Sequence, residues 1–184
     1  MLHPPPLDAC LAACPYAWPW PEAIAAFKFH GDAGKAAPLS TLLRSAPWVE
    51  PALEQAELVL PMPLAPARLR DRGFNQAHEL ARRLAPRKTD PALLLRIRET
   101  SAQSGLKRAE RLRNLHGAFA LEPLRAPAVR GRRVVLVDDV MTSGASLFAA
   151  AQVLRAGGAA HITAIVLART ELPDPPVAPL SPEK

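Results

Sequence analysis

The 184-residue chain is 49% hydrophobic and 22% charged, which is enough to bury one core but not two large ones, so we expect a single small soluble domain. No apolar run approaches the roughly 20 residues that a membrane helix needs, and the N-terminus lacks the basic and then apolar layout of a signal peptide. The sequence therefore predicts a cytoplasmic protein with no membrane contact.

The formal net charge of +6 is unevenly distributed. Residues 66–116 hold 13 basic and 5 acidic side chains, whereas residues 1–65 hold 3 and 6. A basic cluster of this kind serves a pyrophosphate group, a nucleic-acid backbone or solubility, and charge alone does not separate these. Four of the basic side chains, those of Arg82, Arg83, Arg87 and Lys88, have the pattern of a solvated helix surface.

Only two cysteines, Cys10 and Cys14, are present, too few for a disulfide scaffold and consistent with a reducing compartment. Their Cys-x-x-x-Cys spacing has no second pair, so a zinc site would need His3 or another distant ligand. The pattern favours ordinary, partly buried cysteines over such a site.

Proline dominates residues 1–21, for which we expect an irregular N-terminal arm that packs Trp18 and Trp20 on the domain. A short amphipathic helix is predicted to begin at Pro21 and to end near Gly31. Residues 36–43 predict a second helix.

The apolar run at residues 58–60 precedes Pro61-Met62-Pro63, and we interpret it as the first sheet strand followed by a stiff loop. Residues 75–84 are helical by periodicity, with Ala77, Leu80, Ala81 and Leu84 on one face. Weaker patterns predict strands at residues 93–97 and 118–121, a helix at residues 107–115 and a linker at residues 123–131.

Residues 134–137 are four apolar residues, three of them β-branched, which is typical of a central strand covered on both faces of a parallel sheet. Asp138 and Asp139 are expected at the carboxyl end of this strand, where ligands bind in open α/β sheets. Two carboxylates there can grip vicinal hydroxyls directly, or they can hold a hard cation such as Mg²⁺.

The residues that follow the two acids have the opposite chemistry. Thr142 and Ser146 supply hydroxyls, Gly144 lets the backbone approach closely, and the stretch at residues 147–156 begins a helix whose free N–H groups attract a phosphate. The predicted phosphate-binding residues are Thr142, Ser143, Gly144, Ala145 and Ser146. The segment thus predicts a site for a ribose 5-phosphate, against the simpler interpretation of a strand that ends in an acidic turn.

Gly157 and Gly158 are predicted to end this helix, and residues 162–167 predict the next buried strand. Strand, helix and strand in this order form a right-handed βαβ unit, so residues 22–171 are expected to be one α/β domain with a mostly parallel, twisted sheet flanked by helices. Residues 172–184 contain repeated prolines and little to bury, which predicts a disordered tail.

Arginines follow the first predicted strand, from a loop stiffened by prolines. Arg68, Arg70 and Arg72 are candidates to meet a pyrophosphate with a bidentate fork, and we expect one or two of them to do so. The alternative is that Arg70 or Arg72 pairs with Asp71, Glu79 or a sheet edge.

The polar stretch at residues 103–114 lies between two predicted strands, which suits a mobile lid that closes over a ligand. Lys107, Arg108 and Arg111 would then reach a leaving pyrophosphate. The alternative is a solvated helix in which Glu110 forms local ion pairs.

The segment at residues 134–146 resembles the phosphoribosyl pyrophosphate (PRPP) signature of type I phosphoribosyltransferases. That resemblance implies that Asp138 and Asp139 bind the ribose 2- and 3-hydroxyls as the catalytic acids, and that residues 142–146 hold the 5-phosphate. Further matches, at residues 27–32, 60–77, 100–119 and 168–170, are similar to the ComF family within that superfamily.

Membership would imply a type I phosphoribosyltransferase-like fold and a Mg²⁺-dependent transferase that displaces pyrophosphate from C1 of PRPP with an unknown nitrogen acceptor. The alternative is a non-catalytic module that binds PRPP, protein or single-stranded DNA during DNA uptake, beside a helicase-like competence partner. Stacking platforms are typical of single-stranded DNA binders, and residues 66–116 offer only Phe74. ComF-type proteins commonly begin with a zinc ribbon of Cys-x-x-Cys pairs, which this sequence lacks, so either it is naturally short or its start is placed late.

Overall fold

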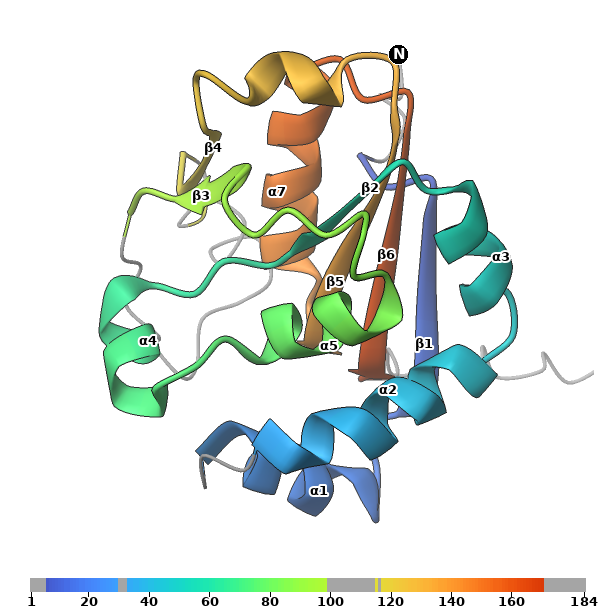
Figure 1. Cartoon of the computed structure of the whole chain (residues 1–184). Helices are drawn as coiled ribbons and strands as arrows, with labels where there is room; N and C mark the ends of the chain where they lie inside the picture. Colours follow the sequence, from blue (N-terminus) through green and yellow to red (C-terminus); the bar gives the residue numbers. More distant parts are fainter. Residues whose placement is uncertain (1–5, 30–32, 99–114, 116, 171–184) are drawn as a thin grey trace, which may run out of the picture.

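The computed structural model describes residues 6–29, 33–98, 115 and 117–170. Its centre is a four-stranded parallel sheet with the strand order β1-β6-β5-β2 (Figure 1). These strands are β1 (Ala9–Pro15), β2 (Leu58–Pro61), β5 (Arg133–Met141) and β6 (His161–Arg169). A separate antiparallel pair is formed by β3 (Leu94–Arg96) and β4 (Phe119–Leu121).

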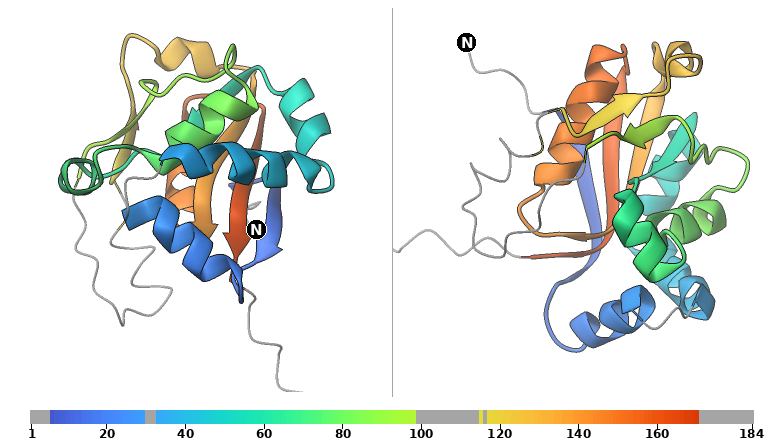
Figure 2. Two further views of the ribbon diagram at one scale, coloured as in Figure 1. Left: turned by 60° about the horizontal axis from the view of Figure 1, so that its bottom comes forward. Right: turned by 90° about the vertical axis from the view of Figure 1, so that its left-hand side faces the viewer.

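Helices cover both faces of the sheet (Figure 2). On one face lies α7 (Ala145–Ala156), with β3 and β4 beside it. The other face is covered by α2 (Ala36–Ser45), α3 (Val49–Gln55) and α5 (Gln76–Leu84), while α1 (Trp20–Phe29) lies beyond the carboxyl ends of the strands. The remaining elements are α4 (Pro66–Arg72) and two short 3-10 helices, Ala33–Lys35 and Ala126–Val129.

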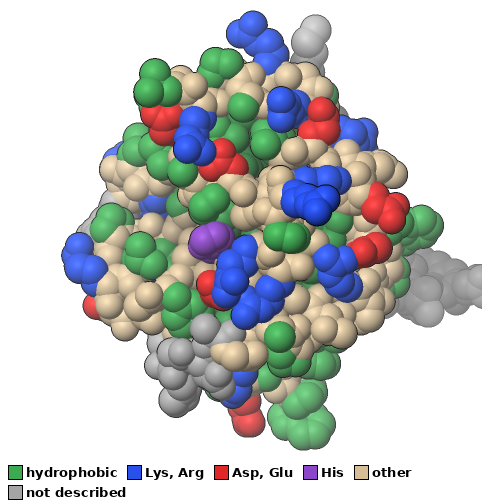
Figure 3. All heavy atoms as spheres, viewed as in Figure 1, with side chains coloured by type: hydrophobic (Ala, Val, Ile, Leu, Met, Phe, Trp, Pro, Cys, Tyr) green, Lys and Arg blue, Asp and Glu red, His purple; other side chains and the backbone are tan. Residues whose placement is uncertain are grey.

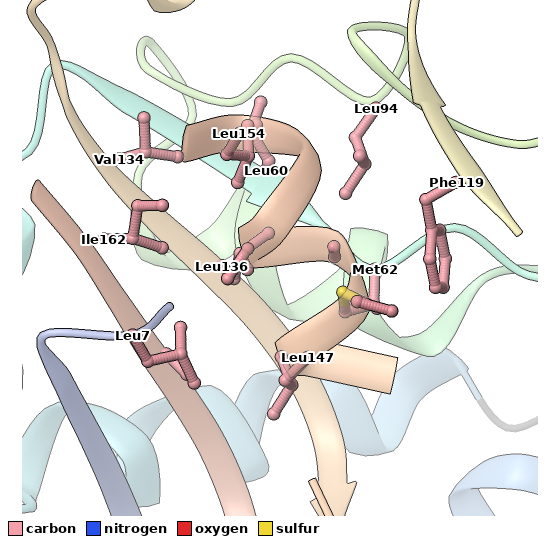
Figure 4. Close-up of a cluster of buried hydrophobic side chains, with 14 of the residues drawn as sticks. Leu7, Leu60, Met62, Leu94, Phe119, Val134, Leu136, Leu147, Leu154 and Ile162 are labelled. Carbon is pink, nitrogen blue, oxygen red and sulfur yellow. The ribbon is translucent and has the colours of Figure 1, made fainter. Parts of the chain in front are cut away.

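The core consists of two apolar clusters, one on each side of the sheet. Val134 and Leu136 of β5 belong to the cluster under α7, whereas Val135 and Val137 belong to the cluster under the opposite helices. This alternation follows from the period of two residues along a strand. Figure 4 shows the first cluster, in which Leu147 and Leu154 of α7 pack near Leu136. The central strand is therefore apolar on both faces, as the sequence predicts.

Local sequence signals explain several of the helix ends. Asn75 caps α5 by accepting a hydrogen bond from the backbone N–H of His78 at 3.2 Å. In α4, Pro66 occupies the first turn, and Gly73 ends the helix at a φ of +76°. The predicted helices at residues 21–31, 36–43 and 75–84 are confirmed as α1, α2 and α5, and all four apolar residues predicted on one face of α5 are buried.

The irregular N-terminal arm is a wrong prediction for part of residues 1–21. Residues 9–15 form β1, an edge strand that pairs in parallel with β6 along its length. Alanine and cysteine dominate β1, so its sequence carries no β-branched signal, and the strand exists because β6 offers it a row of backbone partners. Trp18 is 84% exposed and does not pack on the domain, whereas Trp20 packs against the core.

Three further differences concern the segments around the predicted site. The stiff loop after β2 contains a short helix, α4, and α3 was not predicted. Strand β5 continues four residues beyond Val137, because β6 pairs with it as far as Met141. Asp138 and Asp139 therefore lie within the carboxyl-terminal part of the strand rather than after it. The predicted lid at residues 103–114 and the tail at residues 172–184 lie outside the described residues.

Among the described residues, no helix combines the length and the apolar character needed to cross a membrane.

Candidate functional site

A cavity of about 260 Å³ opens at the carboxyl ends of the central strands. Asp138 and Asp139 of β5 line it, together with Met62, which follows β2, and Tyr16, which follows β1. Thr142, in the loop after β5, also lines the cavity. The cavity thus occupies the position where parallel α/β sheets bind ligands.

The two carboxylates are held by local hydrogen bonds and one ion pair. The backbone N–H of Asp139 donates to Asp138 Oδ1 at 2.9 Å, and the N–H of Val140 donates to Asp139 Oδ1 at 2.6 Å. Lys28 Nζ, from α1, lies 3.0 Å from Asp139 Oδ1, and both side chains are largely shielded, with exposed fractions of 19% and 12%. Asp139 is therefore a hydrogen-bond acceptor with the Lys28 ammonium group at its side.

Burial, together with the neighbouring Asp139 carboxylate, raises the pKa of Asp138 to about 7. The N–H of Asp139 and the charges of Lys28 and Arg72 act in the opposite direction but do not cancel the shift. Adjacent carboxylates disfavour double ionisation, and partial burial reduces contact with the water that would stabilise the charge. Asp138 consequently changes its protonation state near neutral pH.

In the loop after β5, the side chains of Met141 and Phe148 lie close to the backbone of Gly144. This residue has a φ of +75° and caps α7, and a Cβ built on it would lie 2.4 Å from Met141 Cε and 2.7 Å from Phe148 Cε2. Glycine is thus the residue that both the backbone conformation and the space require. Of the five predicted phosphate-binding residues, Thr142 and Ser146 line the cavity, while Ser143 and Gly144 lie in the loop between β5 and α7 and Ala145 begins α7.

The structure separates the three arginines of α4. Arg68 and Arg72 line the cavity, whereas Arg70 does not, although Arg68 and Arg70 are both exposed. Arg72 Nη1 donates to Gln76 Oε1 at 2.9 Å. Burial lowers the pKa of Arg72, while the charge of Asp139 acts against that shift. Lys107, Arg108 and Arg111, the other pyrophosphate-binding candidates, lie outside the described residues.

Several cavity residues were not among the predicted site residues, namely Lys28, Gln76, Arg96 and Tyr16. Gln76 is buried and links two of the cations, because its Nε2 donates to the backbone oxygen of Lys28 at 3.4 Å while its Oε1 accepts from Arg72. Two features of the sequence mark Lys28, because it is the single cation in the mostly apolar helix α1 and lies within residues 27–32, which resemble the ComF family. No local pattern marks Arg96 or Tyr16.

Much of the remaining basic surface is paired or spread out. Glu79 forms ion pairs with Arg82 and Arg83, and Lys88 Nζ donates to two backbone oxygens at the end of α3. Figure 3 shows Lys and Arg side chains interspersed with Asp and Glu on one face of the molecule. These interactions agree with the predicted solvated helix surface for Arg82 and Arg83.

The two cysteines are partly or fully buried in β1. Cys10 Sγ lies 3.3 Å from Met141 Sδ, and Cys14 Sγ donates to the backbone oxygen of Leu167 at 3.1 Å. Burial raises the pKa of both thiols. Within the described ranges, no three His, Cys, Asp or Glu side chains come together as a set of metal ligands.

A second cavity, of about 290 Å³, lies beside α3 at the opposite ends of the strands. Its walls come mainly from α3, β1 and β5, and it contains none of the predicted site residues. The predicted chemistry is therefore concentrated in the first cavity.

Comparisons with known proteins point to the same segment. A family model described as "Phosphoribosyl transferase domain" matches residues 69–179, which include β5, the loop after it and α7. The DNA utilization protein YhgH of Escherichia coli K12 is 34% identical over 178 residues, which cover 91% of this chain and 74% of that protein.

Two relatives carry competence names. Competence protein F of Haemophilus influenzae is 37% identical over 120 residues, covering 64% of this chain and 52% of the relative. Competence protein ComFC of Bacillus subtilis is 32% identical over 155 residues, covering 81% and 59%.

Proposed function

This chain belongs to the ComF-type family of proteins with a phosphoribosyl transferase domain, and we propose that it binds PRPP and displaces pyrophosphate from C1 with a nitrogen acceptor. One observation supports this proposal most strongly. A single cavity of about 260 Å³ joins Asp138 and Asp139 to the hydroxyls of Thr142 and Ser146 and to the guanidinium groups of α4. Those groups complement the hydroxyls and the two anionic ends of PRPP.

Each group has a role that follows from its chemistry. The carboxylates of Asp138 and Asp139 accept hydrogen bonds from the vicinal ribose hydroxyls, and the Thr142 to Ser146 loop anchors the 5-phosphate. Arg68 and Arg72 bind the pyrophosphate.

The C1–oxygen bond breaks as the acceptor nitrogen forms its new bond, so positive charge develops on the ribose. The two acids stabilise that charge, and the phosphate at the far end of the sugar serves as a remote handle.

The residues present fit a Mg²⁺ that arrives with the ligand. The carboxylates of Asp138 and Asp139 both line the cavity, and Mg²⁺ in phosphate sites is usually held by one or two carboxylates plus substrate oxygens and water. Asp138, Asp139 or both would hold such an ion together with ligand oxygens. When bound, it would neutralise charge on the departing pyrophosphate.

The alternative function is a PRPP-binding module that acts in DNA utilisation without turnover. It is favoured by the names of the relatives, which refer to DNA utilization and competence. Direct contact with a nucleic-acid backbone would use exposed cations such as Arg70, outside the cavity. Such binding would weaken steeply with salt and would not depend on Asp138 or Asp139.

Calorimetric titration of PRPP into the protein, with and without Mg²⁺, tests the proposal without knowledge of the acceptor. We expect saturable binding that Mg²⁺ strengthens, followed by pyrophosphate release when amines and nucleobases are supplied with PRPP. Binding without release under every acceptor condition would support the module without turnover. Absence of PRPP binding would contradict both the transferase and the PRPP-binding module without turnover.

A further inference from the structure

We propose that Lys28 is a specificity residue that selects ligands with a pyrophosphate at C1 by bridging Asp139 and that pyrophosphate. The inference rests on the proposed function, because it assigns Lys28 a role toward the part of PRPP that ribose 5-phosphate lacks. Neither the motif at residues 134–146 nor the matched segment at residues 69–179 contains this residue.

The position of Lys28 is fixed by the packing of α1. Phe27, its neighbour, is fully buried, and its ring centroid lies 5.7 Å from that of Phe74. The backbone oxygen of Lys28 accepts a hydrogen bond from the buried Gln76. Since α1 lies beyond the carboxyl ends of the strands (Figure 2), this anchoring holds the ammonium group of Lys28 at the wall of the cavity.

The ammonium group has capacity for a ligand as well as for the protein. It carries three N–H donors, and the ion pair with Asp139 at 3.0 Å engages one of them. A ribose whose hydroxyls are held by Asp138 and Asp139 has its C1 substituent beside the same carboxylates. An anionic substituent there needs a cation between itself and Asp139, because two like charges in contact repel.

The charges around the cavity support this assignment. Among the described lining residues, the carboxylates of Asp138 and Asp139 face four cations, on Lys28, Arg68, Arg72 and Arg96. Lys28 forms an ion pair with Asp139, and it comes from a different element than the arginines. A ligand with only a 5-phosphate and hydroxyls would not use this cation.

The test compares PRPP with ribose 5-phosphate in the wild type and in two variants. Lys28→Met removes the charge, and Lys28→Gln removes it while keeping an N–H donor for Asp139. We expect each variant to lower PRPP affinity by roughly 10- to 100-fold, the loss of one or two charge-assisted hydrogen bonds, and to change ribose 5-phosphate affinity by less than about threefold. Lys28→Arg should recover part of the PRPP affinity.

Lys35→Met, which removes a lysine outside the cavity, is the matched control and should leave both affinities unchanged. Equal losses for PRPP and ribose 5-phosphate in both variants would overturn the inference, because Lys28 would then only support Asp139 and the fold. Unchanged PRPP affinity in the variants would overturn it too. Failure of the proposed function is a separate result, in which the wild type binds neither compound.

Discussion

Asp138 has a carboxyl group whose ionisation is set by its surroundings. Burial and the adjacent Asp139 raise its pKa from the ordinary 3.8 to about 7. A carboxyl whose pKa is higher in the folded state than in the unfolded state makes its full stabilising contribution when the pH is below the unfolded-state pKa. For Asp138 this contribution is lost as the pH rises from about 4 to 7.

Asp138→Asn should therefore increase the free energy of unfolding at pH 8, by an amount on the order of 1 to 3 kcal/mol because solvent reaches the half-buried side chain. At pH 4 the variant and the wild type should have nearly equal stability. Urea unfolding at a series of pH values measures the difference. A stability difference that does not change with pH would show that the pKa of Asp138 is not raised.

Gly144 is the second residue whose environment makes a sharp prediction. Gly144→Ala combines a positive φ with side-chain overlap at Met141 and Phe148, so we expect a loss of about 1 to 3 kcal/mol in stability and weaker binding of the 5-phosphate. Gly131 has a similar φ of +72°, but a Cβ there would contact nothing within 4 Å.

Gly131→Ala is thus the matched control for the contact, since it contains the backbone strain alone. We expect it to cost less stability than Gly144→Ala and to leave ligand affinity unchanged. Thermal unfolding and PRPP titration of both variants check this. Equal effects on affinity would mean that the close approach at Gly144 does not shape the loop.

Helix α4 provides an internal comparison at the scale of one element. Arg68 and Arg70 are both exposed and are separated by one residue, but only Arg68 lines the cavity. Arg68→Met should lower PRPP affinity by roughly 10- to 100-fold, because a charge-assisted contact to phosphate is lost. Arg70→Met should leave it unchanged. Calorimetry on the two variants decides the matter, and equal losses would point to general electrostatic attraction instead.

Strand β1 is fastened to the sheet at its beginning by Asp8. The carboxylate accepts hydrogen bonds from the backbone N–H of Ile162 at 2.6 Å and from Arg155. Burial by itself raises the pKa of Asp8, but these two hydrogen bonds and the nearby positive charge, chiefly that of Arg155, together outweigh it, so the pKa lies below the ordinary 3.8. The stabilising contribution is thus present above about pH 4 and is lost as the pH falls through the folded-state pKa.

Asp8→Asn should lower stability by about 1 kcal/mol at pH 7, a small value because the side chain is partly exposed. The difference should disappear near pH 2. Asp71→Asn, at an exposed position on α4, is the control. If the variant lost the same stability at both pH values, the effect would arise from packing rather than from the charge.

Elements differ in how far their sequences predict them, for physical reasons. The strand at residues 134–137 and helix α5 were predictable, because a β-branched run and a 3.6-residue period are local signals. Strand β1 was not predictable, because its Ala- and Cys-rich sequence forms a strand through pairing with β6, some 150 residues away. The short helix α4 was missed because it buries none of its residues and so has no apolar period.

The whole molecule assembles the cavity from distant parts of the chain. Asp138, Asp139 and the loop to Ser146 were predictable as a group because they are consecutive. The contact between Lys28 and Asp139 joins residues 111 positions apart and depends on where α1 packs, which no local pattern encodes. Likewise, the separation of Arg68 and Arg72 from Arg70 needed the orientation of α4.

The most direct test of the account is a PRPP titration, in the presence of Mg²⁺, of the wild type against the double variant Asp138→Asn, Asp139→Asn. Near-UV circular dichroism of the variant controls for its fold. We expect saturable binding by the wild type and no detectable binding by a folded double variant, since the vicinal hydroxyls would lose both carboxylate acceptors. PRPP affinity that survives unchanged in the double variant would contradict the assignment of this cavity as the phosphoribosyl site.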